Sequence, residues 1–143
     1  MGIVIQGQPV IKGNAQGIAL VTNEPLSFWG GYDFRTGEIT DRRHALSGEN
    51  SAGRILAVPF SRGSSTTTAV LLEAVRANTA PAAIITTNVD TFFALASIVA
   101  EEMYSRPFPV IALSNPDFAL IKSGDSLIIG EDGTIRIEPS GSG

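Results

Sequence analysis

The sequence predicts a single α/β domain in which a mixed, partly barrel-like sheet surrounds a central parallel βαβαβ stretch. Three observations lead to this fold class. Strands alternate with helices in the middle of the chain, short apolar runs suited to strands occupy both ends, and 143 residues with 43% hydrophobic content provide for one core rather than two.

The N-terminal part is predicted to form a layer of short strands. Apolar runs separated by single glycines occupy residues 3–5, 9–11 and 18–21. Residues 27–53 follow with many glycines, charges and turn residues but little periodicity. A loop of this length in a compact domain is usually functional, so we expect part of the site there.

The middle of the chain carries the alternation. The predicted elements are a strand at 55–58, a helix at 66–77, a strand at 83–86, a helix at 90–104 and a strand at 109–113. Strands joined in this way are parallel, with right-handed crossovers. On the second helix, an apolar stripe is predicted to face the core, formed by Phe92, Leu95, Ala96, Val99 and Met103.

The C-terminal part is predicted to return to strands. Asn115 and Pro116 look like a cap with proline at the first helical position, opening a short helix that ends at Ile121. Strands at 127–129 and 134–137 flank an Asp132-Gly133 hairpin turn. We assign residues 1–138 to the domain and treat 139–143, which have linker composition, as a flexible tail or a remnant left by cloning.

Composition excludes several classes of function. Without cysteine, the chain has no disulfide, no thiolate nucleophile and no iron–sulfur cluster of its own, and a single histidine argues against a self-contained transition-metal site. A net charge of -4 gives no electrostatic footprint for nucleic acid or for an anionic membrane. We find no signal peptide and no apolar stretch of about 18 residues, which predicts a cytoplasmic protein.

The loop at 61–68 is the first candidate site, because it lies between a central strand and its helix. Gly63 permits a tight turn, Ser64 or Ser65 can cap the helix, Arg62 can pair with a carboxylate or phosphate, and the hydroxyl of Thr66 adds a polar contact. The helix N-terminus favours an anion. The loop lacks the lysine and spacing of a P-loop, and ordinary capping with a solvated arginine is the competing interpretation.

The segment 27–31 and the polar residues after it form the second candidate. Ser27 precedes the only tryptophan, and Gly30 and Gly31 follow it. Asp33 and His44 lie in the same loop and could position a substrate. The competing interpretation makes Trp29 a core side chain beside a turn, and the histidine incidental.

Three ordered motifs resemble the small subunit of the aconitase X family. They are residues 24–31 followed by Asp33 and Thr36-Gly37, then Arg62-Gly63-Ser64-Ser65, then residues 80–84. The resemblance covers about residues 13–113. Members of this family look like aconitase divided in two, with a small swivelling β/β/α domain and a large subunit that holds iron or an iron–sulfur cluster.

The resemblance implies a role for individual residues. Ser64 matches the serine that acts as general base in aconitase's Gly-Ser-Ser loop, although Ser64 and Ser65 are not distinguished from each other. Where aconitase has arginine and glutamate after its serines, this chain has Thr66 and Thr67, so its substrate-binding arginine has no counterpart at that position. We expect Arg62 to take its place. The remaining expected substrate contacts are Gly63, Ser65, Thr66, Ser27, Gly30, Gly31, Asp33 and His44.

The family has two known activities, the dehydration of cis-3-hydroxy-L-proline and that of phosphomevalonate. The sequence of residues 27–31 and 99–104 is closer to that of the hydroxyproline enzymes. We therefore expect cis-3-hydroxy-L-proline as the substrate, with phosphomevalonate as the alternative. The resemblance implies that this chain acts in a heterodimer or higher complex with the large subunit, on a carboxylate substrate. A stand-alone anion-binding module is the alternative from a different class.

Overall fold

The computed structural model describes residues 2–28, 30–62 and 65–139. The strands and helices along the chain are β1 (Ile3–Gln6), β2 (Gln8–Ile11), β3 (Ala15–Val21), β4 (Tyr32–Asp33), β5 (Glu38–Ile39), β6 (Ile55–Ala57), α1 (Ser65–Arg76), β7 (Ala83–Thr86), α2 (Thr91–Tyr104), β8 (Val110–Ala112), α3 (Asn115–Phe118), β9 (Ser126–Ile129) and β10 (Thr134–Glu138). The predicted α/β class is confirmed. The ends of the predicted strands lie within one or two residues of the observed ends, except that β3 begins three residues earlier than predicted.

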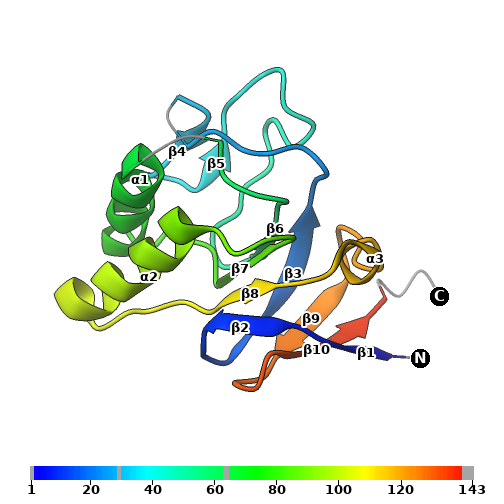
Figure 1. Cartoon of the computed structure of the whole chain (residues 1–143). Coiled ribbons are helices and arrows are strands. Elements are labelled where there is room, and N and C mark those ends of the chain that lie inside the picture. Colours follow the sequence, from blue (N-terminus) through cyan, green and yellow to red (C-terminus); the bar gives the residue numbers. More distant parts are fainter. Residues whose placement is uncertain (1, 29, 63–64, 140–143) are drawn as a thin grey trace.

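Eight strands form one sheet in the order β1-β10-β9-β3-β6-β7-β8-β2. The central strands β3, β6, β7 and β8 pair in parallel, and the pairs at both ends of the order are antiparallel. This mixed sheet is nearly closed into a barrel (Figure 1).

Gly7 joins the two ends of the strand order. It is the single residue between β1, which pairs with β10, and β2, which pairs with β8. Its N–H donates to the carbonyl of Gly133 at 2.9 Å, and a Cβ on Gly7 would lie 2.4 Å from Cγ2 of Ile111. No residue with a side chain fits at this crossing without displacing its neighbours.

The two faces of the central strands supply two separate cores. Along β6, Ile55 and Ala57 face the barrel interior, whereas Leu56 and Val58 face the helices, as the period of two requires. Helices α1 and α2 pack side by side over this second face (Figure 1). Apolar side chains fill both cores, and the buried hydroxyl residues Thr67, Thr68, Thr86 and Ser97 lie on the helices and on β7 around them.

The buried face of α2 differs from the predicted stripe. The buried residues are Phe93, Ala96, Ser97 and Ala100, whereas Leu95 and Met103 are 42% and 60% exposed. The helix is apolar around most of its circumference, so periodicity alone did not identify the side that packs on α1.

Two local predictions need correction near the loops. Helix α3 is capped by Ser114, whose hydroxyl accepts from the N–H of Asp117, so Pro116 is the second helical residue and the helix ends at Phe118. The long loop 27–53 contains a short antiparallel hairpin, in which β4 and β5 have two residues each. Within the described residues, no helix is long and apolar enough to cross a membrane.

Candidate functional site

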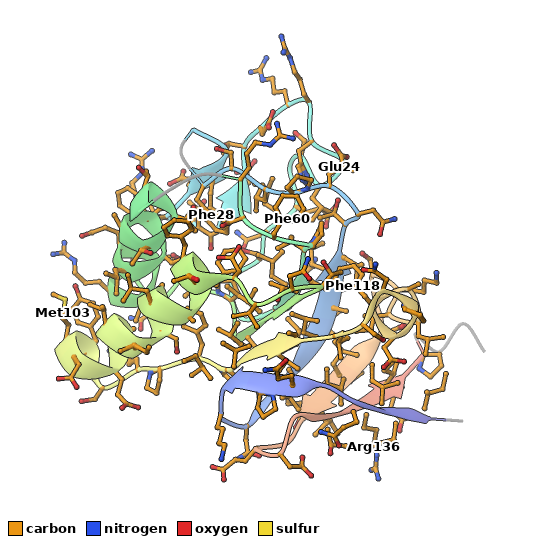
Figure 2. All side chains as sticks on the ribbon, in the orientation of Figure 1. Glu24, Phe28, Phe60, Met103, Phe118 and Arg136 are labelled. Carbon is orange, nitrogen blue, oxygen red and sulfur yellow. The ribbon has the colours of Figure 1, made fainter. Side chains whose placement is uncertain are left out.

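Three loops meet at the carboxyl ends of the central parallel strands. The segment after β3 runs beside the segment after β6: Leu26 and Ser61 form a parallel bridge, and the N–H of Arg62 donates to the carbonyl of Leu26 at 2.9 Å. Figure 2 shows Glu24 and Phe60 in this loop region, with Arg136 at the far end of the molecule. The edge where α/β sheets bind ligands is therefore the edge that carries both predicted motifs.

Asp90 lies in the third of these loops, between β7 and α2, and fixes it to the loop between β6 and α1, which we call the serine loop. Its Oδ1 accepts from the N–H groups of Phe92 and Phe93, which caps α2, and its Oδ2 accepts from both the N–H and the hydroxyl of Ser61 at 2.7 and 2.8 Å. Only 8% of Asp90 is exposed. Four donors thus compensate the buried carboxylate.

A pocket of about 420 Å³ opens between these loops and the turn at 41–44. Its lining is formed by Glu24, Pro25, Ser27, Asp41, Arg43, His44 and Arg62. Three of the predicted substrate contacts, Ser27, His44 and Arg62, are therefore brought to one pocket from positions up to 35 residues apart (62 minus 27).

His44 is held in one orientation. It is 7% exposed, and its Nδ1 accepts the N–H of Leu46 at 3.0 Å. An imidazole that accepts at Nδ1 carries its proton on Nε2 in the neutral form. Among the described residues, the buried Nε2 has no hydrogen-bond partner, and the side chain that carries it lines the pocket.

The charged side chains of the pocket are of both signs. Glu24 accepts the N–H of Ala45 through Oε1, and Asp41 accepts the N–H of Arg43 through Oδ1. The guanidinium groups of Arg43 and Arg62 form no ion pair within the described part of the chain. Each carboxylate thus has one oxygen used by its own loop, and both arginines are available to a ligand.

Gly30 and Asp33 lie elsewhere, in a second pocket of about 430 Å³. The backbone N–H of Arg35, followed by its guanidinium at 3.2 Å, holds the pKa of Asp33 below its usual value. Gly31 is buried between the pockets, where a Cβ would lie 2.4 Å from the carbonyl oxygen of Ser27. A role for Gly30, Gly31 and Asp33 as substrate contacts stays a prediction.

Only part of the serine loop belongs to the described residues. Gly63 and Ser64 lie outside the described residues, Ser65 begins α1, and Thr66 is half-buried in its first turn. That turn carries no acidic side chain. The positive end of the α1 dipole is therefore not neutralised by an acidic side chain in the first turn of the helix.

A family model describes residues 4–137 as the aconitase X swivel domain. The chain belongs to the aconitase X swivel-domain family. It matches the crystal structure of Thermococcus kodakaraensis aconitase X (holo-form) with a TM-score of 0.84 and 29% identity, over 94% of this chain and 98% of that one. A solution NMR structure of a UPF0107 protein matches with a TM-score of 0.80 and 32% identity, over 93% and 97%.

Relatives of this aconitase X swivel domain have two names. Cis-3-hydroxy-L-proline dehydratase of Pseudomonas aeruginosa is 44% identical over 110 residues, which are 77% of this chain and 19% of that protein. The phosphomevalonate dehydratase small subunits of Methanosarcina mazei and Pyrococcus furiosus are 29% and 33% identical, over 99% and 96% of this chain and 95% and 97% of theirs. The chain thus spans about a fifth of the first relative and nearly all of the other two.

Within its described residues, this aconitase X swivel domain shows no group of metal ligands. It has no cysteine, and no three His, Asp or Glu side chains in the described ranges are grouped as metal ligands. Sequence reasoning also missed one important group. Asp90 was expected only as the start of a helix, because no local pattern shows where its second oxygen points.

Proposed function

We propose that this chain is the small subunit of an aconitase X-type dehydratase, with cis-3-hydroxy-L-proline as substrate. The observation that carries the proposal is the convergence of Ser27, His44 and Arg62 on one pocket, with Arg62 two residues before Ser64 in the chain. Family membership and the name of the Pseudomonas aeruginosa relative support the reaction type.

The reaction assigns Ser64 the role of general base. Its alkoxide takes the proton from the carbon beside the substrate carboxylate, the electron pair of that bond forms a carbon–carbon double bond, and the hydroxyl on the next carbon leaves, taking up a proton to become water. A serine hydroxyl is a weak base in water. The N-terminus of α1, immediately after Ser64, supplies N–H groups and positive potential that stabilise the anion.

The iron centre of the enzyme belongs, in this proposal, to a large subunit. The sequence has no cysteine and the described residues show no group of three His, Asp or Glu ligands, and an iron centre on the large subunit would supply a Lewis acid. What this chain contributes is the base, the pocket lining and the exclusion of water on closure. By itself it should be inactive.

Phosphomevalonate is the second candidate substrate, since relatives that match the whole chain are named for it. The higher identity to the Pseudomonas aeruginosa hydroxyproline enzyme, 44% against 29% to 38% for phosphomevalonate dehydratase small subunits, and the sequence of residues 27–31 favour the first. The stand-alone anion-binding module remains as the outcome in which no complex forms.

The test is dehydratase activity of the chain reconstituted with its large subunit, on both substrates, for wild type, Ser64→Ala and Ser65→Ala. We expect turnover of cis-3-hydroxy-L-proline only with both chains, and a loss of kcat of at least about 1,000-fold in Ser64→Ala. Ser65→Ala is the matched control, and a larger loss there than in Ser64→Ala would transfer the base to Ser65. Turnover of phosphomevalonate alone would replace the substrate. No complex and no turnover would leave the binding module.

A further inference from the structure

We infer that the pocket lined by Glu24, Asp41, Arg62 and His44 is a zwitterion site, which receives a carboxylate at Arg62 and His44 and an ammonium at Glu24 and Asp41. The inference rests on the proposed function and adds the chemical class of ligand that the small subunit itself recognises. Its evidence is the unsatisfied donor, the balance of charge and the separate anchoring of each carboxylate.

The unsatisfied donor is Nε2 of His44. A buried N–H without an acceptor costs about 1–3 kcal/mol, and His44 is 7% exposed with Nδ1 already used by Leu46. The side chain lines the pocket. An acceptor atom of a ligand that reaches Nε2 would remove this cost, and a carboxylate oxygen is the strongest acceptor that a small metabolite offers.

The charges of the pocket sum to zero. Arg43 and Arg62 are unpaired among the described residues and contribute two positive charges, while Glu24 and Asp41 contribute two negative charges. These residues line a common pocket without neutralising each other in ion pairs. A ligand with one charge of each sign can pair with both halves.

The two carboxylates are pre-organised by their loops. Oε1 of Glu24 accepts from Ala45 at 3.2 Å and Oδ1 of Asp41 accepts from Arg43 at 3.0 Å, so a hydrogen bond to each loop restrains the side chain before ligand binds. The other oxygen of each can accept from a ligand ammonium at little cost in side-chain entropy.

The two candidate substrates differ in the charges that they carry. Cis-3-hydroxy-L-proline carries one carboxylate and one secondary ammonium, whose net charge is zero. Phosphomevalonate carries a carboxylate and a phosphate, and the phosphate alone has a charge of about −1.5 to −2 at pH 7. Such an anion would face Glu24 and Asp41 with no positive group to offer them, so the pocket disfavours it.

The experiment uses the complete complex and two unreactive ligands that differ in one group. L-proline has the ring ammonium, and L-tetrahydrofuran-2-carboxylate has a ring oxygen in its place. Their dissociation constants are measured by titration calorimetry for wild type, Glu24→Gln, Asp41→Asn and His44→Phe. The control is Glu102→Gln, which removes an exposed carboxylate of α2 away from the pocket.

We expect wild type to bind L-proline at least about tenfold more tightly than the oxygen analogue. Glu24→Gln and Asp41→Asn should reduce this ratio toward one, His44→Phe should weaken both ligands equally, and Glu102→Gln should change neither. Equal binding of the two ligands by wild type, or a ratio that survives both carboxylate variants, would overturn the zwitterion site. Hydroxyproline turnover measured on the same samples separates that failure from failure of the proposed function, and turnover of phosphomevalonate alone would overturn both.

Discussion

Asp90 and Ser61 are 29 residues apart in the chain and share two hydrogen bonds, from the N–H and the hydroxyl of Ser61 to Oδ2 of Asp90. Because the other oxygen of Asp90 caps α2, one buried carboxylate joins a helix end to the loop that leads into Arg62 and Ser64. The position of that loop relative to the sheet therefore depends on a side chain that does not line the pocket.

Asp90→Asn should lower kcat more than it lowers stability. The asparagine oxygen can still cap α2, but its amide would face the N–H of Ser61, where two donors oppose each other. We expect the loop to shift, with a fall in kcat of about tenfold to a hundredfold and a smaller change in KM. Kinetics and thermal unfolding of the reconstituted complex measure both quantities.

The control for this change is Ser97→Ala on the same helix. Ser97 is fully buried and bonds to the carbonyl and the N–H of Phe108, so its loss destabilises α2 without touching the serine loop. An equal loss of kcat in Ser97→Ala would show that Asp90 acts only through the stability of α2.

Gly31→Ala should destabilise the domain. Its Cβ would lie 2.4 Å from the carbonyl oxygen of Ser27, so the backbone at one wall of the pocket must move, at a cost of about 1–3 kcal/mol in the free energy of unfolding. Urea titration followed by circular dichroism measures it. At Gly30, where φ is +75° and the space is open, alanine should cost only about 1–2 kcal/mol from the left-handed backbone. Neutrality at Gly31 would contradict the close packing.

Phe60 and Val89 should contact the large subunit. They are 46% and 54% exposed and flank Ser61 and Asp90, on loops joined by hydrogen bonds from Thr87 to the carbonyl of Pro59. Phe60→Ser and Val89→Ser should each weaken assembly by about tenfold to a hundredfold, as burial of one large apolar side chain implies. Analytical ultracentrifugation measures it, with exposed Ile128→Ser on β9 as control. A loss at Ile128 equal to that at Phe60 would place the interface elsewhere.

Tyr32 should make the domain sensitive to strong base. Burial raises the pKa of Tyr32 to about 12, against 10 for the free side chain. Folding therefore holds the phenolic proton, and this contribution to stability is complete below pH 10 and is lost as the pH rises from 10 to about 12. The full difference corresponds to about 3 kcal/mol. Unfolding by urea at pH 9 and 11.5 should show the loss in wild type, and Tyr32→Phe should remove it; equal losses in both proteins would exclude Tyr32 as the cause.

The parts of the fold that the sequence predicts are those with local patterns. Strands β6 and β7 and the ends of α1 follow from short apolar runs and a capping serine–threonine segment. The buried side of α2 does not, because Leu95 and Phe93 are equally apolar and only packing in the core, where Phe93 meets the ring of Phe28, selects one of them. The hairpin of β4 and β5 has two residues in each strand, too few to show a period.

The site follows the same division. The serine loop is rich in serine, threonine and glycine, and the segment 27–31 combines the only tryptophan with two glycines. Both could therefore be predicted as parts of the site. Their convergence with Asp41 and His44 depends on a turn in the long loop, and the link from Asp90 to Ser61 crosses α1 and β7. Neither has a sequence signal, since both are set by which strands are neighbours.

The crossing at Gly7 has a consequence for the order of folding. The pairs of β1 with β10 join residues at opposite ends of the chain, whereas the contacts among β6, α1, β7 and α2 are between near neighbours in sequence. Contacts between distant residues carry a larger loop-closure cost and form slowly. We therefore expect the parallel centre and its two helices to form early, with the first eleven residues completing the barrel in the last and slowest step.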